Sequence, residues 1–332
     1  MTTAPQDQPD FFRDKVILIT GGTGSFGRTF VRTVVHEYEP KKVIVFSRDE
    51  LKQYEMRTSG FDHPNIRYFI GDVRDAKRLH RALHGVDVVV HAAALKQVPA
   101  CEYNPIEAVE TNINGARNVI DAALDRGVKL VLGMSTDKAA SPNNLYGATK
   151  LVAEKLFVQA NAYAGEEGAR FSCVRYGNVI GSRGSVVPLF KEQRAGGRLT
   201  ITDPRMTRFW ITLEQGVRFV LSCLQWMKGG EVFVPKLPSM NMLELARTIG
   251  PGCEIDTIGI RPGEKLHEAM ITEEEARQVL EFDDRFIIQP LHPWWSQAHW
   301  SHGGQVADDF RYTSDRNDRW LSSEQLMDMI NA

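Results

Sequence analysis

The sequence predicts an α/β fold, in which a doubly wound parallel sheet is followed by a smaller C-terminal lobe. Short apolar runs typical of buried parallel strands recur through the first half, helical stretches separate them, and a glycine-rich turn follows the first run. With 332 residues the chain can form one large core plus a lobe, or two domains. We place the sheet domain at residues 14–175 and the lobe at residues 176–332, with the chain crossing back to the sheet in places.

The first predicted strand, Lys15–Thr20, runs directly into the glycine-rich turn. Gly21, Gly24 and Gly27 would allow a tight turn, close approach of the backbone to a pyrophosphate, and close packing of helix on strand. The helix expected over residues 25–37 would then direct its free N–H groups at the phosphates. A glycine-rich turn is often only a turn, but strand, glycines and helix in this order indicate a dinucleotide site.

The second predicted strand, residues 41–46, ends in Ser47, Arg48 and Asp49. An enzyme that uses NAD usually has an acidic residue here, which binds the ribose 2′-hydroxyl. A hydroxyl and a guanidinium suit a 2′-phosphate instead, and Lys52 lies one helical turn further on, so we predict NADP. Asp49 keeps NAD open, because a shift of the loop by one residue would restore an acid. Arg48 could also be a solvated loop residue.

Further apolar runs extend the predicted sheet. Residues 65–70 form a third strand, and Asp72 and Val73 follow it where a carboxylate could meet the adenine amino group. Residues 86–91 form a fourth strand, followed by Ala92 and two more alanines that either admit a cofactor or simply pack tightly. The remaining predicted elements are a helix over residues 111–126, a fifth strand over 129–134 and a sixth over 171–176.

The segment after the fifth strand, Ser135–Lys150, contains Asp137 and Lys138, then Tyr146 and Lys150. On a helix the Tyr-x-x-x-Lys pair shares one face, and the ammonium would lower the tyrosine pKa, so that Tyr146 could deprotonate an alcohol that loses a hydride. Such pairs also occur by chance, and Asp137 with Lys138 could form a surface ion pair. Their position at the carboxyl end of a parallel strand, where ligands bind, favours catalysis.

Together these motifs resemble the extended short-chain dehydrogenases/reductases, and within them the inverting UDP-N-acetylglucosamine 4,6-dehydratases of the pseudaminic acid pathway. Matching stretches cover most of residues 15–290. The run Thr136-Asp137-Lys138, with Tyr146 ten residues after Thr136, is specific, because related retaining sugar dehydratases typically have Thr-Asp-Glu. The resemblance implies a Rossmann-type fold, an NADP cofactor, a UDP-N-acetylglucosamine substrate and a homo-oligomer, either a dimer or a hexamer.

The resemblance also implies a mechanism. Tyr146, assisted by Lys150 and Thr136, would deprotonate the 4-hydroxyl of the sugar while the hydride on carbon 4 goes to NADP⁺. Lys138, neutral because of burial and the nearby Lys150, would take the carbon-5 proton, and Asp137 would protonate the departing 6-hydroxyl. Return of the hydride to carbon 6 and reprotonation of carbon 5 from the opposite face would give UDP-2-acetamido-2,6-dideoxy-L-arabino-hexos-4-ulose.

Other residues are assigned by the same resemblance, although each arginine taken alone could be a solvated or ion-paired surface group. The expected cofactor contacts are Gly21, Thr23, Gly24, Ser25, Phe26, Gly27, Ser47, Arg48, Lys52, Asp72, Val73, Ala92, Tyr146, Lys150, Val179 and Arg183. The expected substrate contacts are Lys96, Asn178, Thr202, Arg205, Arg261 and Glu264. Among these, the Arg261 guanidinium suits a pyrophosphate and the Glu264 carboxylate suits ribose hydroxyls.

Composition narrows the possible partners. The net charge of −2 gives no field that would attract nucleic acid or an anionic membrane. The sequence has no apolar run near the roughly 18 residues of a membrane span, and its polar start lacks a signal-peptide core. The four cysteines have no paired spacing, so we expect neither zinc nor disulfides, and a cytoplasmic protein.

Two other functions stay open. A UDP-hexosamine 4-epimerase of the same fold would share Tyr146, Lys150 and the cofactor, but it would have no use for a carbon-5 base, so Lys138 discriminates between them. An NADP-sensing or scaffold protein that lost its activity is the third possibility. The intact Thr136 and Asp137 argue against it.

Overall fold

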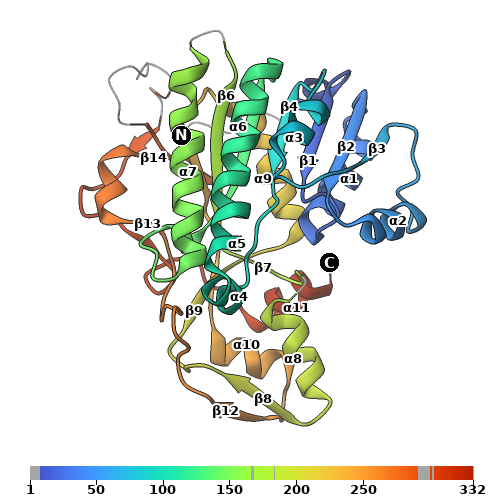
Figure 1. Cartoon of the computed structure of the whole chain (residues 1–332). Helices are drawn as coiled ribbons and strands as arrows, with labels where there is room; N and C mark the ends of the chain where they lie inside the picture. The colour runs from blue at the N-terminus through green and yellow to red at the C-terminus, as the bar shows by residue number, and fades with distance from the viewer. Residues whose placement is uncertain (1–7, 166–167, 183, 291–299, 301–302, 332) are drawn as a thin grey trace.

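The computed structural model describes residues 8–165, 168–182, 184–290, 300 and 303–331. Its centre is a ten-stranded sheet with the order β16-β14-β15-β10-β6-β5-β4-β1-β2-β3 (Figure 1). From β3 to β10 neighbouring strands are parallel, whereas β15, β14 and β16 pair antiparallel at one edge. The predicted α/β fold of the Rossmann type is confirmed.

The six strands of the first half lie at the predicted positions and are strongly apolar, because helices cover both faces of a doubly wound sheet. Their bounds are β1 (Val16–Thr20), β2 (Lys42–Ser47), β3 (Ile66–Ile70), β4 (Val88–His91), β5 (Leu130–Thr136) and β6 (Arg170–Tyr176). Alternate residues of β1 belong to different cores, since Leu18 packs in one cluster and Ile17 and Ile19 in the other. Strand β5 extends two residues beyond the prediction, so Thr136 is its last residue.

Helices cover both faces of the sheet. Helices α6 and α7 lie side by side on the face toward the viewer in Figure 1, and α1 packs against α9 on the other face. The helix predicted over residues 111–126 begins instead as a π-helical turn, Glu110–Asn114. The helices are α1 (Ser25–Glu37), α2 (Glu50–Thr58), α3 (Ala76–Ala82), α4 (Val98–Tyr103), α5 (Pro105–Val109), α6 (Gly115–Arg126), α7 (Leu145–Ala164) and α9 (Leu213–Trp226).

Four strands from the second half complete the sheet: β10 (Val232–Pro235), β14 (Val279–Glu281), β15 (Arg285–Ile288) and β16 (Gly304–Gln305). The boundary predicted at residue 175 stays a prediction. None of the helices in the described ranges is long and apolar enough to cross a membrane.

The rest of the second half forms a lobe below the sheet in Figure 1, with its own core around Phe190, Trp210 and Leu245. Its elements are β7 (Asn178–Val179), α8 (Val186–Arg194), β8 (Arg198–Ile201), β9 (Thr207–Ile211), β11 (Ser239–Asn241), α10 (Met242–Ile249), β12 (Glu254–Thr257) and α11 (Ser323–Asn331). Two short strands, β13 (Ala269–Ile271) and β17 (Tyr312–Thr313), pair with each other.

Candidate active site

A cavity of about 1160 Å³ is lined by residues of both the sheet and the lobe. It runs from the glycine turn, past the end of β5, to the segment that carries Arg261 and Glu264. The predicted site residues that line it are Gly21, Thr23, Gly24, Ser25, Phe26, Gly27, Ser47, Arg48, Lys52, Asp72, Val73, Ala92, Lys96, Thr136, Lys138, Tyr146, Lys150, Asn178, Val179, Thr202, Arg261 and Glu264. Arg183, predicted to contact the cofactor, lies outside the described residues.

The glycine turn has the shape that a dinucleotide requires. Gly21 has a φ of +67°, and a Cβ there would lie 3.0 Å from the backbone of Ala93. Gly24 precedes α1 and has no side chain that could cap the first N–H groups of the helix, so these can meet phosphates. The Thr20 hydroxyl accepts hydrogen bonds from the N–H groups of Ala92 and Ala93, both at 3.1 Å, and thereby holds the alanine loop against the turn. These residues fit a nicotinamide dinucleotide.

At the end of β2, Arg48 and Asp49 have different surroundings. The Asp49 carboxylate caps α2 by accepting the Lys52 N–H at 3.0 Å, and it also pairs with the Lys52 ammonium at 2.8 Å. The Arg48 guanidinium is more than half exposed and lies 3.7 Å from Asp72, whose carboxylate is held by Arg74. Arg48 is therefore the more available of the two groups for a ligand.

The segment between β5 and α7 brings the predicted catalytic residues together. Asp137–Ala139 form a short 3₁₀ turn directly after Thr136. Helix α7 then begins after Asn144, whose side chain accepts the Gly147 N–H at 2.8 Å. Tyr146 and Lys150 are both buried and both line the cavity.

The net pKa shift of Tyr146 is opposite to the predicted lowering. Lys150 donates to the main-chain carbonyl of Met134 on β5, and burial lowers the pKa of its ammonium group. Burial raises the pKa of Tyr146 to about 12, and this is only partly offset by the Lys138 charge and a hydrogen bond with Thr136. The physical reason is that desolvation of the buried phenolate outweighs its cationic neighbours. Among the charged neighbours, Lys138 has the largest lowering effect on the Tyr146 pKa.

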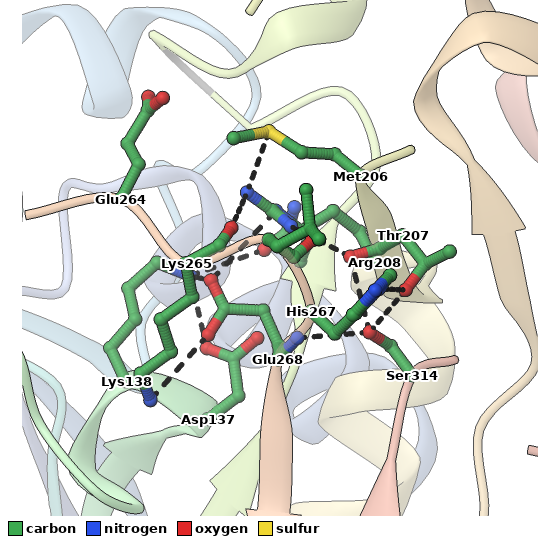
Figure 2. Close-up of polar contacts among 12 residues, drawn as sticks. Asp137, Lys138, Met206, Thr207, Arg208, Glu264, Lys265, His267, Glu268 and Ser314 are labelled. Carbon is green, nitrogen blue, oxygen red and sulfur yellow. Dashed lines mark hydrogen bonds and ion pairs between the residues drawn. The ribbon is translucent and has the colours of Figure 1, made fainter. Parts of the chain in front are cut away.

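Lys138 lies between two buried carboxylates. Its Nζ is 3.0 Å from Asp137 Oδ1 and 3.5 Å from Glu268 Oε1 (Figure 2). Asn178 Oδ1 is also 3.5 Å away. Burial alone would lower the lysine pKa, but the two carboxylates outweigh it and raise the pKa well above its usual value. The expectation that burial and Lys150 make Lys138 neutral is therefore wrong for this arrangement.

The pKa of Asp137 is raised as well, which for a carboxyl group favours the uncharged form, whereas for Lys138 it favours the charged form. The Asp137 carboxyl group is fully buried, and burial together with the nearby Glu268 raises its pKa, although Lys138 and the Thr136 hydroxyl act against this. The Thr136 hydroxyl donates to Asp137 Oδ1 at 2.8 Å, whereas Oδ2 has no hydrogen-bond partner in the described structure. Asp137 lies behind the cavity wall rather than on it, and it reaches the cavity through Lys138.

The predicted substrate residues are only partly brought together. Arg261 and Glu264 line the cavity 3.7 Å apart. Lys96 also lines it, and burial, followed by the charge of Lys138, lowers the Lys96 pKa. Arg205 is not a cavity residue, because its exposed guanidinium binds Asp203 at 2.7 Å.

Sequence reasoning missed three charged residues near Lys138, namely Arg208, Lys265 and Glu268. Arg208 and Lys265 surround the Glu268 carboxylate at 3.8 and 3.9 Å. All three lie in stretches that were already used for the resemblance, so a search of those stretches for acidic residues would have found Glu268. Among the described residues, no cluster of His, Cys, Asp or Glu could hold a metal ion.

Arg175 lies near this site but does not line the cavity, and its contacts stabilise the fold. Its guanidinium is completely buried and pairs with Glu154 at 2.5 Å and with Glu275 at 2.9 Å. It also donates to the carbonyl of Met270 at 2.7 Å, and thereby ties β6 and α7 to β13. This bridge fixes the chain that follows Glu268.

Comparison with known proteins is consistent with this geometry. Residues 17–290 match a family described as polysaccharide biosynthesis protein. The chain belongs to this family of extended short-chain dehydrogenases/reductases. It is 53% identical to the inverting UDP-N-acetylglucosamine 4,6-dehydratase of Campylobacter jejuni, over 96% of this chain and 98% of the relative. A UDP-glucose 4-epimerase of Rickettsia canadensis is 43% identical, over 96% of both chains.

Solved structures give the same result. Pen from Bacillus thuringiensis superposes with a TM-score of 0.88 at 40% identity, covering 97% of this chain and 98% of that one. DesIV, a dTDP-glucose 4,6-dehydratase from Streptomyces venezuelae with NAD bound, has a TM-score of 0.68 at 25% identity, covering 76% and 86%. The predicted family, and with it the prediction of an enzyme of the sugar-nucleotide dehydratase type, is confirmed. A nicotinamide cofactor follows from the family.

Proposed function

We propose that this chain is an NADP-dependent UDP-N-acetylglucosamine 4,6-dehydratase that inverts carbon 5. The observation that carries the proposal is Lys138, which is on the cavity wall with a buried carboxyl group 3.0 Å from its nitrogen. A simple alcohol dehydrogenase needs only Tyr146, whereas removal of a carbon-5 proton and loss of a 6-hydroxyl need one more base and one more acid. Lys138 and Asp137 supply both.

In this mechanism Tyr146 takes the proton of the 4-hydroxyl as carbon 4 is oxidised. The glycine turn, Ser47 and Arg48 would hold the nicotinamide dinucleotide, which when bound would supply the hydride acceptor for carbon 4 and the hydride donor for carbon 6. Lys138 favours the phenolate of Tyr146 by its charge, and Thr136 does so by its hydrogen bond. Lys150 holds the end of β5 through the Met134 carbonyl and so keeps this wall of the cavity in place.

The acid and the base share one proton. When Lys138 is charged and Asp137 ionised, neither has the form that elimination needs. Transfer of one proton from Nζ to Oδ1, across 3.0 Å, gives a neutral amine and a protonated carboxyl group together. Burial favours this uncharged form, because it removes two charges from a region of low dielectric constant. Lys138 can then remove the carbon-5 proton, and the proton stored on Asp137 can reach the departing hydroxyl by way of Lys138, because Asp137 itself lies behind the cavity wall.

We further propose NADP rather than NAD. Support comes from Asp49, which is engaged as the cap of α2 and as the partner of Lys52. Arg48 is left at the rim of the cavity, where a 2′-phosphate would form a charge-assisted hydrogen bond with it. Ser47 lies beside it and also lines the cavity.

At the other end of the cavity, we assign Arg261 and Glu264 to the UDP moiety and Lys96, Asn178 and Thr202 to the rest of the substrate. Arg261 can pair with pyrophosphate oxygens, and Glu264 can accept from ribose hydroxyls. We do not assign Arg205 to the substrate, because it binds Asp203 outside the cavity.

A role in pseudaminic acid synthesis and a homo-oligomeric state, as a dimer or a hexamer, belong to the same proposal. The homo-oligomeric state rests on the resemblance to the family. The cytoplasmic location stays a prediction from the sequence.

The deciding experiment is proton NMR of the purified protein with UDP-N-acetylglucosamine in deuterated buffer. A new carbon-6 methyl signal, deuterium at carbon 5 and an L-configured 4-keto product are expected. A product changed only at carbon 4 would replace the proposal with a UDP-hexosamine 4-epimerase, the alternative favoured by the similarity to the Rickettsia epimerase. An unchanged substrate, with NADP bound, would favour a sensor.

A further inference from the structure

Glu268 is a buried carboxylate at the site to which the proposed mechanism gives no role. Its residue is only 3% exposed, and it lies just before β13. Its backbone is fixed by Ser314, since the Glu268 N–H donates to the Ser314 hydroxyl at 2.9 Å and the Ser314 N–H donates to the Glu268 carbonyl at 2.8 Å. The side chain therefore has a defined position beside Lys138 and Asp137 (Figure 2).

The other groups around Glu268 are already engaged with main-chain carbonyls. The Arg208 guanidinium donates to the carbonyls of Thr207, Leu266 and Lys265 at 2.7–3.0 Å. The Lys265 ammonium donates to the carbonyl of Ala140 at 2.6 Å. Lys138 Nζ is nearer to the Glu268 carboxylate, at 3.5 Å, than either of these cations.

We propose that Glu268 is a positioning residue for the Asp137–Lys138 pair: its carboxylate holds the Lys138 ammonium group and retains one proton on the pair. A negative charge beside the pair raises the proton affinity of both members, because it favours the charged amine and disfavours the ionised carboxyl group. Without that charge the pair would lose its last proton at a lower pH, and the acid that protonates the leaving hydroxyl would disappear with it. This consequence for catalysis rests on the proposed function.

A pH test must take account of every group that faces Lys138. The charged and titratable groups around it are Asp137, Tyr146, Glu268, Arg208, Lys265 and Lys96. Of these, only Asp137 and Glu268 are carboxyl groups, which can be anionic near neutral pH. Removal of the Glu268 charge therefore leaves Asp137 as the one carboxylate of this set that can pair with Lys138. Glu268→Gln removes that charge while keeping the size of the side chain.

The first measurement is competitive labelling of lysine amines with acetic anhydride across pH, read by mass spectrometry, which requires no turnover. The Lys138 side chain is 24% exposed, so a small reagent can reach it. In the wild type, Lys138 should label at a higher pH than the exposed Lys155. In Glu268→Gln its midpoint should fall by about 1–3 pH units. In Glu268→Asp, which keeps the charge, the Lys138 midpoint should lie close to its wild-type value.

Glu231→Gln is the matched control, because Glu231 is equally buried but binds Ser172 and Gly229 away from the cavity. It should leave the Lys138 midpoint unchanged. A wild-type Lys138 that labels like Lys155, or a Glu268→Gln protein with an unshifted midpoint, would overturn the proposal.

The second measurement is the pH dependence of kcat for dehydration. In Glu268→Gln the alkaline limb should move to lower pH, whereas a purely structural role would lower kcat equally at every pH. If the wild type forms no 4-keto product, the proposed function fails, and the labelling result still decides the role of Glu268.

Discussion

Lys150 donates to the main-chain carbonyl of Met134, and Tyr146 has Lys138 and Thr136 as its acid–base neighbours instead. The residue that makes Tyr146 a better base is thus the same one that is proposed to deprotonate carbon 5. In the proposed mechanism, oxidation at carbon 4 and elimination across carbons 5 and 6 would therefore both depend on the side chain of Lys138.

Tyr146→Phe should slow the first step, the oxidation of carbon 4. Burial raises the pKa of the phenol to about 12, so the wild-type rate of carbon-4 oxidation should rise with pH up to that value. Loss of a general base typically costs about 10²–10⁴-fold. Single-turnover measurement of reduced cofactor would test this. Tyr163→Phe, at an exposed position of the same helix, should retain the full rate.

Lys138→Met should separate the two halves of the reaction. Tyr146 remains, so reduced cofactor should still form, although more slowly because a favourable charge is lost. No carbon-6 methyl group and no deuterium at carbon 5 should appear in proton NMR. Lys155→Met on the surface of α7 is the control for the substitution itself. Normal dehydration by Lys138→Met would remove Lys138 from the mechanism.

Arg48→Ala should reduce the preference for NADP. A charge-assisted hydrogen bond contributes about 1.5–3 kcal/mol, which corresponds to a loss of roughly 10–100-fold in NADP affinity. Affinity for NAD should change little, because it has no 2′-phosphate. Calorimetric titration of both cofactors gives the ratio, and Arg57→Ala, near the end of α2, serves as the comparison. An equal loss for both cofactors would argue against a 2′-phosphate contact.

Arg175→Met should destabilise the fold rather than change the chemistry directly. It leaves Glu154 and Glu275 without their buried partner, which costs about 3–5 kcal/mol. Urea unfolding measures the loss, and Arg170→Met, at the exposed start of the same strand, should have a small effect.

The same pair gives a pH dependence with a definite sign. The Glu275 pKa is lowered from 4.5, because Arg175 outweighs the effect of burial. Its contribution to the free energy of unfolding is therefore complete above pH 4.5 and is lost as pH falls through the lower, folded-state value. Arg175→Met should remove this part of the acid sensitivity. A variant as acid-sensitive as the wild type would contradict the assignment.

The sequence predicts local features better than distant ones. The strand that ends in the glycine turn, and the Tyr146–Lys150 helix, follow from periodicity and spacing within short windows. The pKa of Lys138 does not, because it depends on Glu268, which lies 130 residues beyond Lys138 in the sequence, just before β13. The outcome for Arg205 has a different, local cause, since its guanidinium pairs with Asp203, two residues earlier in the sequence.

Strand β10 pairs in parallel with β6, with Phe233 opposite Val174, and thereby covers an edge that would otherwise be open. The residues of β6 from Phe171 to Arg175 are all buried, so the uncovered strand would present apolar side chains beside unpaired N–H and C=O groups. A fragment that stops at Tyr176 would hold every glycine of the cofactor turn and both members of the Tyr146–Lys150 pair. Its open β6 edge would also be free to pair with other chains and would thereby promote aggregation. Shortened versions for binding studies should therefore retain the chain through β15.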